Sequence, residues 1–202
     1  MKRSLKISFR DNKDLISFIE YLNKNLPREN IYIISEGKNV KIIFRETERD
    51  KVLFVKIKKL YEEWKELYYK KDKRRIPLLY ILRESNLRTA IPVSVISEVL
   101  NLMGYVSKIE DMYLISDVDL EVLKDIVRVF SEKYRESLLL KAEPLAKRLI
   151  SMVATVKRIS IEESIRYLVE LGLLKMNEDK KKYVLLKNYQ DCLDILSRKT
   201  EL

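Results

Sequence analysis

Apolar residues recur along this chain at two spacings that change from segment to segment, and this pattern limits the fold more than any other feature. Leu5, Ile7 and Phe9 are spaced two apart, which is typical of a strand with one buried face. Later apolar residues are spaced three and four apart, which is typical of an amphipathic helix. Up to residue 69 the pattern predicts strand, helix, hairpin and helix, over residues 5–9, 13–26, 31–44 and 49–69.

The middle of the chain repeats much of this order. Residues 92–134 predict a helix, a tight hairpin and a second helix that Asp117 caps. We interpret this segment as an internal repeat of the first that lacks the first strand. Residues 141–202 predict helix, helix, hairpin and helix, the order of a winged-helix-like module. The predicted fold is α+β. It has a basic β-α-β-β-α unit at 1–75, an α-β-β-α unit at 76–140 and a C-terminal helical module at 141–202.

Composition places the chain among ordered globular proteins. Of its 202 residues, 47% are hydrophobic and 36% are charged, and only three are glycines. Neither a membrane-spanning run nor a secretory leader is visible, and the lone Cys192 fits a helical, buried position. We therefore expect a cytoplasmic protein with no membrane association, whose abundant charged residues resemble thermophile usage.

The sequence lacks the residues on which most enzyme mechanisms depend. The chain has no histidine, and no glycine-rich nucleotide-binding motif occurs. The carboxylates between Asp117 and Asp125 superficially suggest a cation site, but they fail the calcium-loop pattern and fit a helix cap. We expect no metal, no cofactor and no catalysis, with a carboxylate-based or Lys/Tyr-based enzyme as the exception left open.

Positive charge is concentrated near the start of the chain. The formal net charge is +10, and residues 1–75 hold 21 Lys and Arg against 12 Asp and Glu. Such a concentration favours a polyanion-binding surface, although a charge of this size also serves solubility.

Alternation predicts where the first cations lie. Lys6 and Arg10 on one strand, and Lys41 and Arg45 on another, would share the sheet face opposite the helices. The same face would carry Tyr32, Ile34 and Ile43. Cations interleaved with an aromatic ring can contact phosphates and stack a base. The alternative is that this face packs on the second repeat or on another subunit.

Two further clusters are basic. Five of six positions at 70–75 are cations, which favours phosphate contacts over a solvated linker. A second cluster lies at the predicted C-terminal hairpin, whereas the helix before it carries Glu162, Glu163 and Glu170 against Arg166, which disfavours reading of a DNA groove. The candidate residues of these two clusters are Lys70, Lys71, Lys73, Arg74, Arg75, Lys180, Lys181 and Lys182.

The whole pattern resembles a known family. The order of elements, ending in the segment ESIRYLVELGLL, is similar over nearly all 202 residues to an archaeal family of uncharacterised proteins. Residues 5–69 also resemble in topology the small dimer-forming subunit of the KEOPS tRNA-modification complex. Both resemblances rest on apolar patterns, so neither brings catalytic residues to this chain.

These observations predict a non-catalytic protein that binds structured RNA, in association with the ribosome or with tRNA processing. One alternative is a protein-interaction subunit of an archaeal complex, with a protein partner or a second copy of itself. Another is a DNA-binding regulator.

Overall fold

The computed structural model describes residues 2–26, 31–45, 48–69 and 73–200, and within them it describes no side chain at 2–3, 36, 44–45, 48–51 and 200. The chain divides into two compact units, residues 1–69 and 70–202. Helices combine with small antiparallel sheets in both, so the α+β prediction is confirmed. Among the described residues no helix is both long and apolar enough to cross a membrane.

The first unit has the predicted element order. The side chain of Asp11 accepts the backbone N–H of Asp14 at 2.9 Å and caps the first helix. The three strands form an antiparallel sheet in the order β1-β3-β2, which leaves β1 and β2 at the edges. The elements are β1 (Lys2–Ser8), α1 (Asn12–Asn25), β2 (Tyr32–Glu36), β3 (Asn39–Arg45) and α2 (Glu48–Tyr68).

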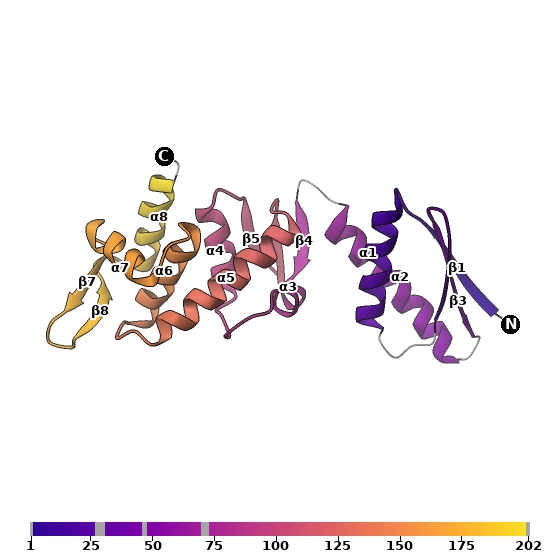
Figure 1. Ribbon diagram of the computed structural model, residues 1–202, viewed down its shortest axis with the longest axis horizontal. Coiled ribbons are helices and arrows are strands. Elements are labelled where there is room, and N and C mark those ends of the chain that lie inside the picture. The colour runs from indigo at the N-terminus through magenta and orange to yellow at the C-terminus, as the bar shows by residue number, and fades with distance from the viewer. Residues whose placement is uncertain (1, 27–30, 46–47, 70–72, 201–202) are drawn as a thin grey trace. The chain divides into compact units, whose positions relative to one another are not determined.

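An aromatic cluster holds the first unit together. Both helices lie on the same side of the sheet (Figure 1), and the alternate residues Ile7, Val40 and Ile42 are buried beneath them. Trp64 is fully buried, and its ring lies 5.5 Å from those of Phe9 and Phe18. One face of the sheet therefore packs against the core. No described element of this unit covers the other face.

The second unit contains a strand that the sequence pattern missed. Its sheet has the order β4-β6-β5, so the prediction that the repeat lacks a first strand is wrong: Arg74–Pro77 pairs with β6. Two arginines and a proline in four residues hide that strand, because none is a typical strand former. The elements are β4 (Arg74–Pro77), α3 (Leu78–Glu84), α4 (Ser94–Leu102), β5 (Ser107–Glu110), β6 (Tyr113–Ser116) and α5 (Leu120–Leu138).

The predicted cap of α5 also needs correction. Asp119 accepts the backbone N–H of Glu121 at 2.9 Å and is the N-cap, two residues later than predicted. Asp117 instead accepts the backbone N–H of Val106 at 3.1 Å. Both residues precede an apolar run by a short distance, so the pattern alone does not separate them.

The C-terminal part has the predicted order of helix, helix, hairpin and helix. The capping box of Ser160 and Glu163 is present, and Gly172 has the positive φ of +65° that a residue after a helix end often adopts. A parallel bridge joins Ala142 to Tyr183, so the stretch before the first of these helices extends the hairpin. The elements are α6 (Pro144–Val156), α7 (Ile161–Glu170), β7 (Leu174–Asn177), β8 (Lys182–Leu185) and α8 (Tyr189–Thr200).

A polar cluster joins the two halves of the second unit. Arg148 on α6 pairs with Glu98 on α4, and the Tyr189 hydroxyl on α8 donates to Glu98 Oε2 at 2.7 Å. Burial raises the pKa of Tyr189, with the Glu98 carboxylate adding to it. Since α5 and α6 also pack together, the predicted boundary at 140–141 lies inside one compact unit, and the boundary at 75–76 lies inside β4.

Candidate nucleic-acid interface

The pairing of β1 with β3 places two lysines directly opposite each other. The register opposes Lys6 and Lys41. The backbone N–H of Phe9 donates to the carbonyl of Lys38 at 2.9 Å, so residues 9, 7 and 5 of this strand form the hydrogen-bonded pairs. Lys6 and Lys41 therefore form a pair that is not hydrogen-bonded, in which side chains approach more closely. Two like charges at such a position destabilise the sheet.

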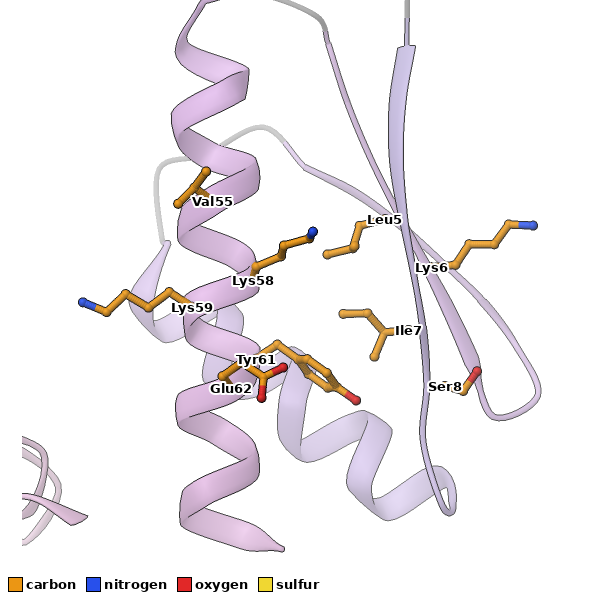
Figure 2. A pocket seen from close by; sticks show the side chains of 9 residues that line it. All are labelled: Leu5, Lys6, Ile7, Ser8, Val55, Lys58, Lys59, Tyr61 and Glu62. Carbon is orange, nitrogen blue, oxygen red and sulfur yellow. The ribbon is translucent and has the colours of Figure 1, made fainter. Parts of the chain in front are cut away.

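Both lysines point away from the protein core. Figure 2 shows the Lys6 and Ser8 side chains on the side of β1 opposite α2, while Leu5 and Ile7 point toward α2. Lys6 and Lys41 are exposed, and among the described side chains neither has an ion-pair partner within 4 Å. They border a shallow hollow of about 350 Å³ together with Ser8, Ile34 and Asn39.

Apolar and aromatic side chains adjoin these cations. Tyr32 on β2 is 62% exposed and Ile34 is 45% exposed, and the register places Ile34 beside Lys41. Ile43 lies next to Tyr32 across the strands. The open face of the first sheet, meaning Lys6, Ser8, Tyr32, Ile34, Asn39, Lys41 and Ile43, thus combines charge with surface on which a planar ring can stack.

Backbone pairing also places Lys2 opposite Arg45. This pair is four residues from the Lys6 row, which corresponds to about 13 Å along the strand. The predicted site residue Arg45 is therefore on the expected strand, and the side chains of Lys2 and Arg45 lie outside what the structure describes.

Arg10 does not join this group, which corrects the prediction that it shares the face of Lys6. Strand β1 ends at Ser8, so alternation no longer applies two residues later. The Arg10 guanidinium instead lies 4.0 Å from the centroid of the Tyr69 ring, just past the end of α2. Burial raises the pKa of Tyr69 to about 12, with the Asp14 carboxylate as a further cause.

The cluster at 70–75 is not one continuous basic loop. Lys70 and Lys71 lie outside the described residues, and Lys73 is exposed just before β4. Arg74 is nearly buried, donates to the carbonyl of Val118 at 2.5 Å and lies 3.5 Å from the Asp119 carboxylate. Arg75 points to the opposite face, 4.1 Å from the centroid of the Tyr113 ring. The strand thus separates two cations that the sequence groups together.

The C-terminal cations are only partly available. Lys182 lies 2.8 Å from a carboxylate oxygen of Glu143, whereas Lys180 and Lys181 are exposed at the turn of the β7-β8 hairpin. On α7 the three glutamates Glu162, Glu163 and Glu170 are exposed, as is Arg166. The acidic surface predicted for this helix is therefore present.

The carboxylates around α5 have structural partners. Asp117 and Asp119 accept backbone N–H groups, and Glu121 lies 2.7 Å from the Lys124 ammonium. Hydrogen bonds from Arg158 and Arg128 lower the pKa of Asp125. Across the part of the chain that the structure describes, no group of three or more potential ligand residues could hold a metal ion.

Two contributors to the open face were not predicted from the sequence. Ser8 and Asn39 form the row next to Lys6 and Lys41, where the Ser8 hydroxyl donates to Asn39 Oδ1 at 2.6 Å. Ser8 lies two residues after Lys6 on the same strand, so strand alternation places it on the same face. Asn39 is harder to find, because its residue type and its place beside Gly37 and Lys38 are those of a hairpin turn.

Comparisons with known proteins identify a family but no function. A family model described as "Uncharacterized protein conserved in archaea (DUF2067)" matches residues 7–194, which is most of the chain. No curated protein and no solved structure shows a significant match.

Proposed function

The chain belongs to an archaeal family of uncharacterised proteins, and from its own residues we propose that it is a non-catalytic RNA-binding protein. The observation that carries the proposal is the Lys6–Lys41 pair on the open face of the first sheet. Two lysines held side by side without a described counter-charge cost stability, and a phosphate between them would offset that cost.

The neighbouring residues favour a nucleic acid over a free anion. Tyr32 and Ile34 present ring and alkyl surface beside the cations, and the Ser8–Asn39 row adds hydroxyl and amide groups. A base stacked on Tyr32 would leave a flanking phosphate near the Lys6–Lys41 row, which is the next row on this face of the sheet. Transfer RNA and ribosomal RNA both offer unpaired loops of this kind, so structured RNA is the proposed substrate class.

Duplex DNA suits this surface less well. Reading the DNA major groove requires a cationic helix or ribbon that enters it. In the winged-helix-like module proposed for residues 141–202, α7 would be that helix, yet it exposes Glu162, Glu163 and Glu170. Phosphates on both sides of the groove would repel these carboxylates. DNA regulation is therefore the weaker proposal.

Neutralising the lysine pair tests the proposed function. The double variant Lys6→Gln and Lys41→Gln should bind an RNA hairpin about tenfold more weakly, which corresponds to about 1.4 kcal/mol. The slope of log K against log salt should become shallower by about 0.7 for each loop phosphate that the variant no longer neutralises. Fluorescence anisotropy across a salt series measures both quantities.

A matched control separates this site from general basicity. The variant Lys13→Gln and Lys56→Gln removes the same charge from exposed positions on α1 and α2, the helical side of the unit, and should bind nearly as well as the parent. Equal weakening in both variants would leave only nonspecific polyanion binding. Equal competition by a DNA duplex of matched phosphate count would remove the RNA preference, and no RNA binding at physiological salt would favour the protein-interaction alternative.

A further inference from the structure

A groove separates the edge strand β1 from helix α2 in the first unit. It encloses about 760 Å³ and is lined by Leu5, Ile7, Val55, Lys58 and Tyr61 among others. Figure 2 shows Leu5 and Ile7 pointing from β1 toward α2, and Lys6 pointing away from it. The groove is thus distinct from the open face of the first sheet, although one strand borders both.

The exposed edge of β1 carries unpaired backbone groups. Residues 5, 7 and 9 direct their N–H and C=O groups toward β3, so Ser4, Lys6 and Ser8 direct theirs to the opposite side. β1 is an edge strand, and no described strand pairs with that side. Donors and acceptors of this kind are the template on which another extended segment adds to a sheet.

The side of the groove formed by α2 adds an apolar and positive surface. Val55 lines the groove and is 65% exposed, so it presents apolar surface to an occupant. Glu62, the acidic residue of the lining, lies 2.8 Å from the Lys65 ammonium and is thereby neutralised. Lys59 points away from β1 in Figure 2 and lies 3.9 Å from a carboxylate oxygen of Glu63. The positive charge of the groove therefore comes from Lys58, whose ammonium lies 4.5 Å from the centroid of the Phe54 ring. An occupant with apolar and acidic side chains would complement it.

A second copy of the chain fits this edge poorly. Strand β1 reads KRSLKIS, with three cations and no carboxylate, so antiparallel pairing of β1 with its own copy would bring six cations together and supply no compensating carboxylate. An RNA strand would leave the backbone donors and acceptors of Ser4, Lys6 and Ser8 without the regular partners that a peptide supplies. An acidic extended peptide satisfies the backbone, the apolar lining and the charge together.

We propose that the free edge of β1 and the adjoining groove bind an extended acidic segment of a partner protein, which adds to the sheet beside β1. Apolar side chains on one face of that segment enter the groove against Leu5, Val55 and Tyr61, and its carboxylates lie near Lys58. The site goes beyond the proposed RNA binding. Lys6 borders both hollows, but its side chain points away from the groove (Figure 2), and Lys41 does not line the groove.

The test uses the full chain and a short synthetic peptide of alternating valine and glutamate that carries a fluorophore. The variant Ser4→Pro removes one outward N–H while sparing the hydrogen bonds between β1 and β3, because proline is tolerated at an outward edge position. Binding should weaken about tenfold relative to the parent, through the missing hydrogen bond and the clash with the added strand. The control Ser4→Val keeps the N–H and should bind like the parent.

A second pair of variants tests the groove wall. Val55→Glu places a carboxylate in the lining and should weaken peptide binding, whereas Val52→Glu makes the same change at an exposed position of α2 outside the lining and should not. Amide exchange should show new protection at Ser4, Lys6 and Ser8 when the peptide is bound.

Three results would overturn the proposal: no binding of the valine–glutamate peptide, equal binding of a valine–lysine peptide, or equal binding by Ser4→Pro and Ser4→Val. Loss of RNA binding in Val55→Glu without any peptide binding would assign the groove to RNA and would also overturn it. None of these results would remove the RNA site, because these variants leave Lys6 and Lys41 in place.

Discussion

The two sheets of this protein share a strand order but use their cations differently. Both place the last strand of three in the centre, as β1-β3-β2 and β4-β6-β5. On the open face of the first sheet, Lys6, Lys41 and Ile34 form one row across the three strands. Among the described side chains neither lysine has an ion-pair partner. In the second sheet the equivalent row is Arg75, Ile115 and Lys108, where an isoleucine separates the two cations.

The cations of the second sheet already have partners. The Lys108 ammonium lies 2.6 Å from Glu110, and Arg75 lies over the Tyr113 ring. Arg74 faces inward and is held by Val118 and Asp119. An equal topology therefore does not imply an equal site, because a cation becomes available to a ligand only where its neighbours do not already compensate its charge.

The largest expected effect that tests this difference between the two sheets is a change in the stability of the second unit. Replacing Arg74 by alanine should lower the free energy of unfolding of the second unit by about 2 kcal/mol, because the buried Val118 carbonyl loses its donor. Replacing the exposed Lys73 by alanine should change it little. Thermal unfolding followed by circular dichroism measures the loss.

The fluorescence of the first unit is an internal control for that experiment. Trp64 is the single tryptophan and lies in the core of the first unit, so its emission should report an unchanged transition. Equal stability of the Arg74→Ala and Lys73→Ala variants would show that Arg74 is not structural and would make the two sheets more alike.

The next effect concerns RNA affinity. The double variant Arg75→Gln and Lys108→Gln should bind an RNA hairpin within about twofold of the parent, against about tenfold weaker binding when Lys6 and Lys41 are changed. The reason is that Arg75 and Lys108 already interact with Tyr113 and Glu110. Anisotropy at one fixed salt concentration compares the two. If this variant lost as much RNA affinity as the variant of Lys6 and Lys41, the two sheets would not differ in this respect. The second sheet would then be a binding surface as well.

The smallest effect is a gain in stability. Replacing Lys41 by glutamine removes a like-charge contact with Lys6 and should raise the free energy of unfolding of the first unit by about 0.2–1 kcal/mol. Urea unfolding followed by Trp64 fluorescence measures the gain, which should shrink as salt screens the repulsion. Lys38→Gln, at the exposed hairpin turn, is the matched control. A destabilised Lys41→Gln variant would contradict the claim that the pair costs stability.

Local patterns predicted much of the secondary structure. Helix α1 and the hairpin of β2 and β3 follow from residue spacings that act within a few positions. Strand β4 and helix α3 were not predicted, because β4 is short and is stabilised by pairing with the distant strand β6. The period of a four-residue segment is too short to identify it.

The candidate site was predicted in part for the same reason. Lys6, Lys41 and Tyr32 lie on the open face as alternation indicates, because alternation holds wherever a strand is regular. Arg10 follows the end of its strand, and Arg74 and Arg75 belong to a strand that the pattern concealed. For these three residues the predicted placement was wrong, because regular local structure ended there or was not recognised.

By itself the sequence determined the α+β class, the concentration of positive charge near the N-terminus and the lack of histidine chemistry, because each follows from composition or from short-range periodicity. The tertiary structure decided which cations are available. The register of β1 and β3 brings Lys6 against Lys41, while the fold of the second unit places Arg74 beside the Val118 carbonyl and Arg75 over Tyr113. Whether a charge is compensated depends on residues that are distant in sequence, and only the folded chain brings them together.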